Sequence, residues 1–315
     1  MRILVVSDGR RGIENQALGL AEAVAEHTET ECTIVAHHVS HRPSFAALPP
    51  SLQLTVRRNY GLPDADLVIG CGRQAIAPLI AVRRSGAAAF TVYVQDPRIE
   101  PSRFDLVIAP EHDGLSGPFV ETMIGSPNRI TRGAIIGGTL SHAARLSPLP
   151  MPRAMIAIGG PSKTHAMGEA TIQSHLDAAR DLIQKGYSLL ITTSRRTPET
   201  TQKAWQSFAK NRDNVWLHTP QSDAANPYFA FLGGAYIILV TEDSTNMLTE
   251  ACTTGKQVYR LGMKGTPGKF QRLYDALETR CHVKLWDGFL EDRPYPALDE
   301  TSRVAQAIIA RLAAR

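Results

Sequence analysis

The chain has 315 residues, 43% of them hydrophobic and 20% charged, which is the composition of a folded globular protein and excludes a disordered one. Its 34 basic and 30 acidic residues are mixed along the sequence and give a net charge of +4, so the basic stripe of a nucleic-acid-binding protein is absent. The length exceeds that of most single cores, and two domains are therefore expected.

Alternating strands and helices are expected in the first half of the chain. A strand over residues 3–6 leads into a polar turn, and the helix expected at 14–26 carries apolar side chains on one face. The same alternation continues with strands at 33–36, 67–69, 90–94 and 106–109, a helix near 74–84, and a loop at 37–50.

A proline-rich segment at 146–152 predicts a stiff linker, after which the alternation starts again. Strands are expected at 155–158, 189–192 and 215–218, and helices at 169–185, 199–210, from 227, at 269–278 and at 300–315. Such alternation predicts the α/β class with parallel sheets. We expect an N-terminal Rossmann-like domain at 1–147, a second at 153–298, and a C-terminal helix at 299–315.

Four scattered cysteines favour reduced thiols over a disulfide or zinc framework. Cys32, Cys71, Cys252 and Cys281 include no C-x-x-C pair, and the ten histidines show no metal-ligand spacing. We therefore expect a cytoplasmic protein without a metal or a cofactor. The N-terminal apolar run is too short for a signal peptide, and no run approaches the ~20 apolar residues of a membrane-spanning helix. Peripheral contact with the inner membrane stays open.

The segment 236–261 predicts an anion site. An apolar, β-branched run favours a parallel strand buried on both faces, followed by the turn Thr241-Glu-Asp-Ser-Thr-Asn246 and a short helix. Ser244 is a good N-cap, and Gly255 can adopt the left-handed conformation after the helix. The N–H groups at the helix start favour a phosphate, and the Glu250 carboxylate just beyond suits a diol.

Two further strand ends carry turns that suit an anion. In Gly159-Gly-Pro-Ser-Lys-Thr164, Ser162 and Lys163 can donate to phosphate oxygens, although the P-loop spacing is absent and a plain tight turn is the alternative. Arg195 and Arg196, at the end of the next strand, can neutralise a diphosphate or can simply be solvated. The convergence of the three turns at one sheet edge favours a phosphate site.

A competing signal is Gly70-Cys-Gly-Arg-Gln-Ala75, which fits the dinucleotide fingerprint with Asp96 about twenty residues later. It does not follow the first strand of its domain, and Arg73 and Gln74 are bulky where a pyrophosphate would lie. An NAD(P)-dependent oxidoreductase is therefore the weaker alternative.

Polar residues at two strand ends of the first domain suit an acceptor and a general base. Asp8 and Asp96 are the candidate bases, although either can also cap a turn, and Glu14 is better explained as a helix-start carboxylate. The candidate acceptor-binding residues are Arg10, Asn15, Gln16, Gln95 and Arg98.

Four motifs resemble one known family over most of the chain. They are Ser7-Asp-Gly-Arg-x-Gly-x-x-Asn-Gln-Ala-Leu-Gly-Leu-Ala21, Gly159-Gly-Pro-Ser, Thr193-Ser-Arg-Arg-Thr-Pro198 and Thr241-Glu-Asp-Ser-x-Asn-Met-x-x-Glu250. They look like the bacterial relatives of the plant mitochondrial fission protein Elm-one. Members are described as candidate glycosyltransferases or as a domain of unknown function. The resemblance implies the GT-B architecture, with two Rossmann-like domains whose sheets face across a cleft and a C-terminal helix that packs back on the first domain.

The second domain is also distantly similar to the peptidoglycan N-acetylglucosaminyl transferase. That likeness implies a nucleotide-diphosphate site at Gly160, Ser162, Ser244 and Thr245, with Glu250 on the ribose. Lys163, Ser194, Arg195, Arg196 and Asn246 complete the predicted set. The base and the acceptor do not carry over from that enzyme.

The predicted function is therefore the transfer of a sugar from a nucleotide sugar to an unknown acceptor, for which a lipid-linked molecule is one option. A non-catalytic adaptor that kept the GT-B fold, as in the fission-linked plant relatives, is the alternative from another class.

Overall fold

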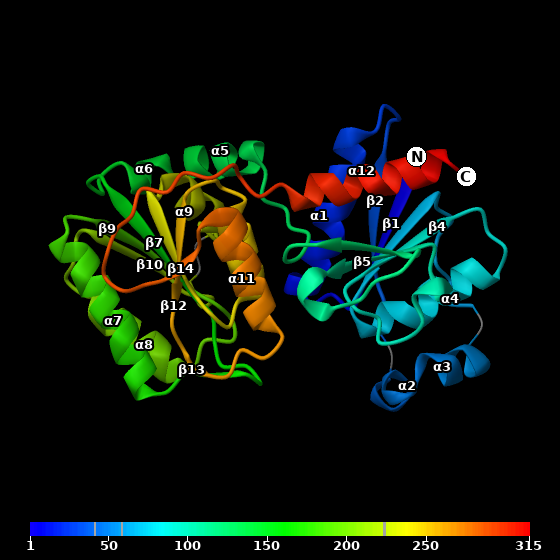
Figure 1. Cartoon of the computed structure of the whole chain (residues 1–315), viewed down its shortest axis with the longest axis horizontal. Coiled ribbons are helices and arrows are strands. Elements are labelled where there is room, and N and C mark those ends of the chain that lie inside the picture. The colour runs from blue at the N-terminus through cyan, green and yellow to red at the C-terminus, as the bar shows by residue number, and fades with distance from the viewer. Residues whose placement is uncertain (41, 58, 223–224) are drawn as a thin grey trace. The chain divides into compact units, whose positions relative to one another are not determined.

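The chain divides into two compact units, each built on a parallel sheet (Figure 1). The computed structural model describes residues 1–40, 42–57, 59–222 and 225–315, and for Pro43 its backbone alone. Unit 1 is Met1–Arg129 with Asp299–Arg315, and unit 2 is Ile130–Leu298. The predicted α/β class is confirmed. The division falls before residue 130, whereas the prediction placed it at 147–153.

Unit 1 contains a six-stranded sheet in the order β2-β1-β3-β4-β5-β6, with all neighbours parallel. Its strands are β1 (Arg2–Ser7), β2 (Thr33–His38), β3 (Leu67–Cys71), β4 (Phe90–Val94), β5 (Leu106–Pro110) and β6 (Val120–Met123). Its helices are α1 (Arg11–His27), α2 (Pro43–Ala47), α3 (Pro50–Val56), α4 (Ile76–Arg84) and α12 (Glu300–Ala313).

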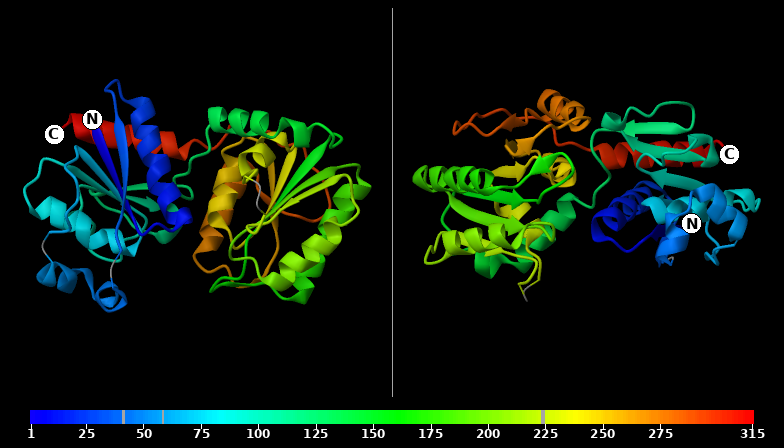
Figure 2. Two further views of the ribbon diagram at one scale, coloured as in Figure 1. Left: turned by 180° about the vertical axis from the view of Figure 1, so that it is seen from behind. Right: turned by 90° about the horizontal axis from the view of Figure 1, so that it is seen from below.

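Both faces of this sheet are covered, which explains why its central strands read as unbroken apolar runs. On one face α1 and the C-terminal α12 lie side by side, and Leu20 and Ile308 share a core with Val5 (Figure 2). On the other face Leu79 of α4 and Val68 of β3 belong to a second core. The C-terminal helix thus completes the core of unit 1.

Unit 2 contains the second six-stranded parallel sheet, in the order β10-β9-β7-β11-β12-β14. Its strands are β7 (Arg153–Ile158), β9 (Ser188–Thr193), β10 (Val215–His218), β11 (Ile237–Thr241), β12 (Gln257–Leu261) and β14 (Lys284–Leu285), and β8 (His165–Ala166) pairs antiparallel with β13 (Lys264–Gly265). Its helices are α5 (Arg132–Ser141), α6 (Ala143–Leu146), α7 (Glu169–Gln184), α8 (Glu199–Ala209), α9 (Tyr228–Gly234), α10 (Thr245–Cys252) and α11 (Phe270–Cys281).

Helix α5 explains why the division between the units lies earlier than the proline-rich segment predicts. None of its residues is buried, but it packs closely on α9. A Cβ on Gly138 would meet the Phe229 Cβ at 2.6 Å, and one on Gly233 would meet Thr139 Oγ1 at 2.1 Å. These glycines let the two helices approach closely, and this contact ties residues 130–146 to unit 2.

Other elements also depart from the sequence-based expectation. The expected loop over 37–50 contains α2, which begins at Pro43, a residue type that suits a first helical position. Residue 41 lies outside the described residues. Strand β6 and the two-residue strands β8 and β13 have no pattern long enough to reveal them.

A lysine ammonium closes the C-terminal end of α9. Lys256 Nζ donates to the carbonyls of Leu232 (2.5 Å), Gly233 (2.7 Å) and Ala235 (2.6 Å), which lack helical partners there. Burial lowers the pKa of Lys256 to about 8. The cation is the type of group that the negative end of a helix dipole favours.

We expect Lys256→Met to lower the free energy of unfolding by about 1–3 kcal/mol, because it leaves these carbonyls without their donor. The measurement is urea unfolding of the full chain. Lys203→Met is the matched control: its ion pair with Glu199 is exposed, with 70% of the lysine side chain in solvent, so a change within about 0.5 kcal/mol is expected. Equal effects of the two substitutions would contradict the role given to Lys256.

Candidate functional site

The candidate site lies at the carboxyl ends of β9, β7 and β11, which are neighbours in the sheet of unit 2. If the six strands of this sheet are numbered by their order in the chain, their order across the sheet is 3-2-1-4-5-6, which is the order of the dinucleotide-binding fold. The order reverses between β7 and β11, and open α/β sheets bind ligands at such a point. The three turns expected to converge do follow these adjacent strands.

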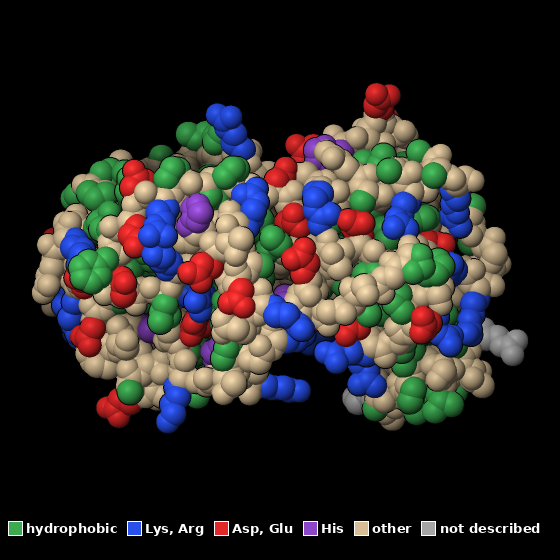
Figure 3. Space-filling model, viewed as in Figure 1, with side chains coloured by type: hydrophobic (Ala, Val, Ile, Leu, Met, Phe, Trp, Pro, Cys, Tyr) green, Lys and Arg blue, Asp and Glu red, His purple; other side chains and the backbone are tan. Residues whose placement is uncertain are grey.

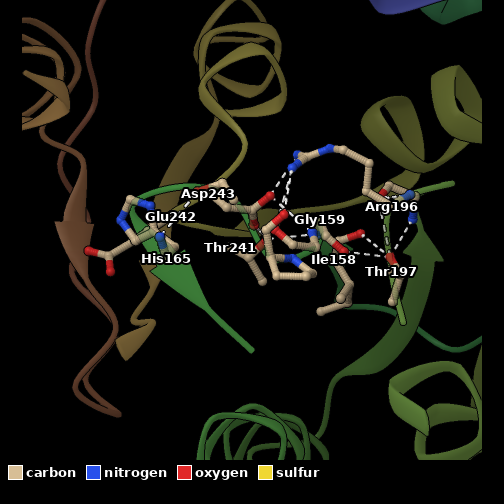
Figure 4. A network of polar contacts seen from close by, with 12 residues as sticks. Ile158, Gly159, His165, Arg196, Thr197, Thr241, Glu242 and Asp243 are labelled. Atoms are coloured by element: carbon tan, nitrogen blue, oxygen red, sulfur yellow. Dashed lines mark hydrogen bonds and ion pairs between the residues drawn. The ribbon is translucent and has the colours of Figure 1, made fainter. Parts of the chain in front are cut away.

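A buried carboxylate occupies the point between β7 and β11 (Figure 4). The Asp243 side chain has no exposed surface. Its Oδ2 accepts from Gly160 N at 2.9 Å and from Arg196 Nη2 at 2.7 Å, and its Oδ1 accepts from Thr241 Oγ1 at 2.7 Å. A charge removed from water needs such partners, so these bonds hold the three strand ends together.

The two glycines after β7 are required by close contacts. A Cβ on Gly159 would lie 2.3 Å from Asp243 Oδ2, and one on Gly160 would lie 2.2 Å from the Arg196 carbonyl oxygen. Gly159 N donates to Thr241 Oγ1 at 2.8 Å. Both glycine N–H groups, which could have bound a phosphate, therefore bond to the protein itself.

The turn after β9 is tied to β7 by Thr197. Its hydroxyl donates to the Gly159 carbonyl and accepts from Ser194 N at 2.9 Å. Arg196 leaves this turn with half of its side chain exposed, and its Nη1 lies 3.4 Å from the carbonyls of Gly160 and Pro161. Arg196 is thus a cation held over the turn that follows β7.

The remaining predicted diphosphate residues are placed as follows. Ser162 Oγ accepts from the N–H groups of Thr164 (3.2 Å) and His165 (3.1 Å) within its own turn. Lys163 and Arg195 are exposed, and neither side chain bonds to a residue that the structure describes.

Helix α10 begins after Ser244, as predicted, but this side chain makes no capping bond within the described part of the chain. Thr245 and Asn246 form the first turn of the helix and are half-buried. These positions agree with an anion site, but the roles assigned to Ser162, Lys163, Ser194, Arg195, Ser244, Thr245 and Asn246 stay predictions.

Glu250, on α10, pairs with a tyrosine that the sequence reading missed. Tyr228 Oη, from the first turn of α9, donates to Glu250 Oε2 at 2.6 Å. Burial raises the pKa of Glu250 to about 7, although the bond from Tyr228 opposes this rise. The same burial, with the negative charge of Glu250, raises the pKa of Tyr228 well above its usual value.

Glu242, the acid that precedes Asp243, bonds to β12 and to the segment that follows it. Glu242 Oε1 accepts from Arg260 Nη1 at 2.6 Å, and Glu242 Oε2 accepts from Met263 N at 3.0 Å. Arg260 also lies 4.4 Å from the centre of the Tyr274 ring, and Tyr274 Oη donates to the Glu242 carbonyl at 2.8 Å. Both acids of the turn therefore have structural partners.

In unit 1 the order of the strands reverses between β1 and β3, and Asp8 lies at this point. Both Asp8 oxygens accept from Arg10: Oδ1 from its N–H at 3.2 Å and Oδ2 from Nε at 2.9 Å. Burial would raise the pKa of Asp8, but the hydrogen bonds and charge of Arg10 outweigh it and hold the pKa below its usual value. A lowered pKa makes Asp8 a weaker proton acceptor than a free carboxylate.

A second Asp-x-Arg pair follows β4. Asp96 Oδ1 accepts from Arg98 N at 2.8 Å, and Asp96 Oδ2 lies 2.9 Å from Arg98 Nε. The charges of Asp8 and Asp96 both act on the buried Tyr93, whose pKa is raised first by burial. Both candidate bases therefore lie around one side chain, and their catalytic role stays a prediction.

The two predicted glutamines meet at this edge. Gln95 Nε2 donates to the buried Gln16 Oε1 at 3.1 Å, and Gln95 has a φ of 91°, a conformation rare outside glycine. Of the other predicted acceptor residues, Asn15, Arg10 and Arg98 are exposed. Their function as an acceptor site stays a prediction.

The dinucleotide-like motif does form a strand, a turn and a helix. Gly72 has a φ of 87°, and a Cβ on Gly70 would lie 2.6 Å from Leu79 Cδ1, so this glycine permits close packing of α4 on β3. Arg73 Nη2 donates to the Ala47 carbonyl at 3.0 Å. Local packing thus explains the spacing of this motif without a dinucleotide.

Residues 11–312 match the family described as Mitochondrial fission ELM1. The chain belongs to this family. The Mitochondrial fission protein ELM1 of Arabidopsis thaliana is 29% identical over an alignment of 287 residues, gaps included, that covers 82% of this chain and 66% of the plant protein, just under two thirds of its length. The Uncharacterized protein RP120 of Rickettsia prowazekii (strain Madrid E) is 22% identical over an alignment of 355 residues, gaps included, that covers 98% of each chain.

Solved structures similar to this ELM1-family chain include two epimerases. UDP-GlcNAc 2-epimerase from Neisseria meningitidis, bound to UDP-GlcNAc, has a TM-score of 0.59 at 14% identity and covers 100% of both chains. The Methanocaldococcus jannaschii enzyme, in complex with UDP-GlcNAc and UDP, has a TM-score of 0.53 at 11% identity and covers 98% of this chain and 100% of its own. At these identities the likeness shows the fold alone, which is the GT-B fold.

One face of the ELM1-family protein is mixed in charge. On the face drawn in Figure 3, Lys and Arg side chains are interspersed with Asp and Glu. Within the described ranges, no helix is long and apolar enough to cross a bilayer. No group of three or more His, Cys, Asp or Glu side chains in the same ranges could hold a metal ion.

We expect Arg196→Ala to lower the free energy of unfolding by about 1–3 kcal/mol, because it leaves the Asp243 carboxylate buried without its cation; the loss is smaller than for a fully buried pair, since half of Arg196 is in solvent. Urea unfolding measures the change. Arg195→Ala is the control, with an expected effect within about 0.5 kcal/mol. In a background of Asp243→Asn the cost of Arg196→Ala should shrink; an unchanged cost would refute the pairing.

Proposed function

We propose that unit 2 binds the diphosphate of a nucleotide sugar at the carboxyl ends of β9, β7 and β11, and that the protein transfers the sugar to an acceptor. The observation that carries this proposal is the half-exposed guanidinium of Arg196, held at the point where the strand order reverses. A planar cation in this position suits the paired oxygens of a diphosphate.

The groups around Arg196 support an anion. Lys163 and Arg195 are exposed on the two flanking turns, and α10 starts with the buried Ser244 at its N-cap and the half-buried Thr245. The positive end of the helix dipole adds to these cations. In a transfer reaction, this set would stabilise the negative charge that develops on the departing nucleoside diphosphate. This mechanism involves no metal or cofactor.

For unit 1 we propose the acceptor. Gln16 and Gln95 offer amide groups to a polar molecule at the carboxyl edge, and Asp8 or Asp96 would accept the proton of the attacking hydroxyl. Each aspartate bonds to the arginine two residues further along the chain. Arg10 holds the pKa of Asp8 below its usual value, which makes Asp8 a weaker proton acceptor. A lipid-linked acceptor, with peripheral contact at the inner membrane, fits within this proposal.

One observation favours a second candidate, an adaptor without catalysis. The N–H groups of Gly159 and Gly160 bond to Thr241 and to Asp243, so the protein's own carboxylate stands where an anion could bind. The Arabidopsis relative is named a mitochondrial fission protein. An adaptor would keep this edge for stability alone and would bind no nucleotide.

Nucleotide binding separates the two candidates. Thermal unfolding is measured with UDP, GDP, CDP or ADP. The transferase proposal predicts that at least one of these ligands, at ~100 times its Kd, stabilises the protein by ~2.7 kcal/mol. Arg196→Ala should weaken binding at least about tenfold, the loss of one charge-assisted hydrogen bond. Lys185→Ala, at the far end of α7, is the control and should bind as the unaltered protein does.

If none of the four nucleotides or their sugar conjugates stabilises the protein, the transferase proposal fails and the adaptor remains. If Arg196→Ala leaves nucleotide binding intact, the nucleotide binds somewhere other than this edge of the sheet.

A further inference from the structure

The excess positive charge of the protein comes from one part of unit 1. Residues 32–95 contain six arginines, no lysine and two aspartates, which gives this stretch a net charge of +4 with histidine neutral. The whole chain also carries +4, so basic and acidic residues are balanced over the rest of it. Within this stretch, residues 32–63 contain no acid at all. The elements α2, α3 and α4 therefore form the basic part of the molecule.

Helix α3, which packs on α4, presents two apolar side chains to solvent (Figure 1). Leu52 is 51% exposed and Val56 is 72% exposed, and residues four apart lie on the same face of a helix. The rest of the helix is fixed to unit 1, because Leu54 belongs to its core and Gln53 Nε2 donates to the Leu48 carbonyl at 2.9 Å. The apolar pair is thus held outward by a helix that is anchored on its other side.

Arginines at the end of α4 lie beside this helix. Leu54 and Arg84 line one hollow of about 530 Å³, and Arg84 lines a second, of about 220 Å³, with Arg83 and Arg103. Arg83 pairs with Asp105 at 3.4 Å. Arg84 and Arg103 are exposed, and neither pairs with a carboxylate of the residues that the structure describes. Two exposed guanidinium groups at one hollow favour an anionic group such as a phosphate.

The combination of apolar and cationic side chains indicates the kind of partner that fits. A bilayer with anionic lipid offers negative headgroups to the arginines and acyl chains to Leu52 and Val56. A second copy of this chain would bring the same positive charge, and two side chains are few for a stable dimer, which buries about 800 Å² per partner. RNA would match the charge but would leave the apolar pair in water.

We propose that α3 and the arginines around it, Arg57, Arg84 and Arg103, dock unit 1 on a bilayer surface that contains anionic lipid, with Leu52 and Val56 inserted among the headgroups. This goes beyond the proposed function and does not depend on it, because a protein that binds no nucleotide would dock in the same way. The contact is reversible, since a few arginines and two apolar side chains bind far less tightly than a membrane-spanning helix.

The experiment measures co-sedimentation of the full chain with sucrose-loaded vesicles of phosphatidylcholine, alone or with about one third phosphatidylglycerol. We expect binding to the anionic vesicles to be at least about tenfold stronger, because each arginine near an anionic surface contributes about fivefold. Raising the salt from about 0.1 M to about 0.5 M should weaken the binding, because salt screens the arginines.

The apolar pair is tested by Leu52→Ser/Val56→Ser, which should weaken binding to the anionic vesicles about tenfold because it removes the groups that enter the bilayer. Ile136→Ser/Leu140→Ser on α5 is the matched control. These side chains are also four residues apart and are 47% and 70% exposed, and their replacement should leave vesicle binding unchanged.

The cations are tested by Arg84→Ala/Arg103→Ala, which should weaken binding to the anionic vesicles at least about tenfold. Lys203→Ala/Lys210→Ala is the control, because it removes the same charge from exposed positions of unit 2. It should leave binding within about twofold of the unaltered protein, since charges away from the surface are screened.

Fluorescence gives an independent readout of insertion. The indole in Leu52→Trp should be quenched by anionic vesicles whose lipids are brominated on their acyl chains. The indole in Leu140→Trp, at a side chain that is 70% exposed on α5, should not be quenched. Equal quenching of the two indoles contradicts insertion by α3.

Other outcomes also overturn the proposal. They are equal binding to both kinds of vesicle, binding to neither, and binding to the anionic vesicles that both test variants retain. Binding of poly(U) without vesicle binding would assign the surface to nucleic acid, and a dimer that Leu52→Ser/Val56→Ser dissociates would assign it to a second copy. Vesicle binding by a protein that binds no nucleotide refutes the transferase and leaves the docking surface standing.

Discussion

A buried carboxylate at the centre of a sheet edge is the constraint on which the architecture of unit 2 depends. The Asp243 side chain has no contact with solvent, and a buried charge is tolerated only when its partners are close and well oriented. Its three partners come from three different strand ends: Gly160 after β7, Arg196 after β9 and Thr241 at the end of β11. The two glycines, the Arg196 turn and the order of the strands are therefore parts of one arrangement.

The same arrangement decides how an anion could bind. An edge whose backbone donors were free would bind phosphate through N–H groups at the end of β7 and the start of a helix. Here the donors of Gly159 and Gly160 are engaged, so the exposed cations and the first turn of α10 are the groups left for a ligand. This makes Arg196 the link between stability and proposed function, since it neutralises Asp243 with one nitrogen and faces solvent with half of its surface.

Much of this could be predicted from sequence because it depends on local pattern. The apolar runs of β7, β9 and β11 and the turns after them are legible in one dimension, and the class of fold follows from their alternation. The partner of Glu250 could not be predicted, because Tyr228 is 22 residues away and on another helix. The hydrogen bond from Gly160 N to Asp243, 83 residues away, could not be predicted either, because it depends on β7 lying beside β11. The boundary between the units was misplaced for the same reason: the packing of α5 on α9, through Gly138 and Gly233, is a long-range fact.

The left-handed backbone of Gln95 sets the stability of unit 1 against the position of one amide group. Holding a residue with a Cβ in such a conformation costs about 1–3 kcal/mol, and glycine would avoid most of that cost. A glycine, however, could not donate to Gln16 across the edge of the sheet. The chain thus gives up stability at the end of β4 to keep an amide at a fixed point beside Gln16.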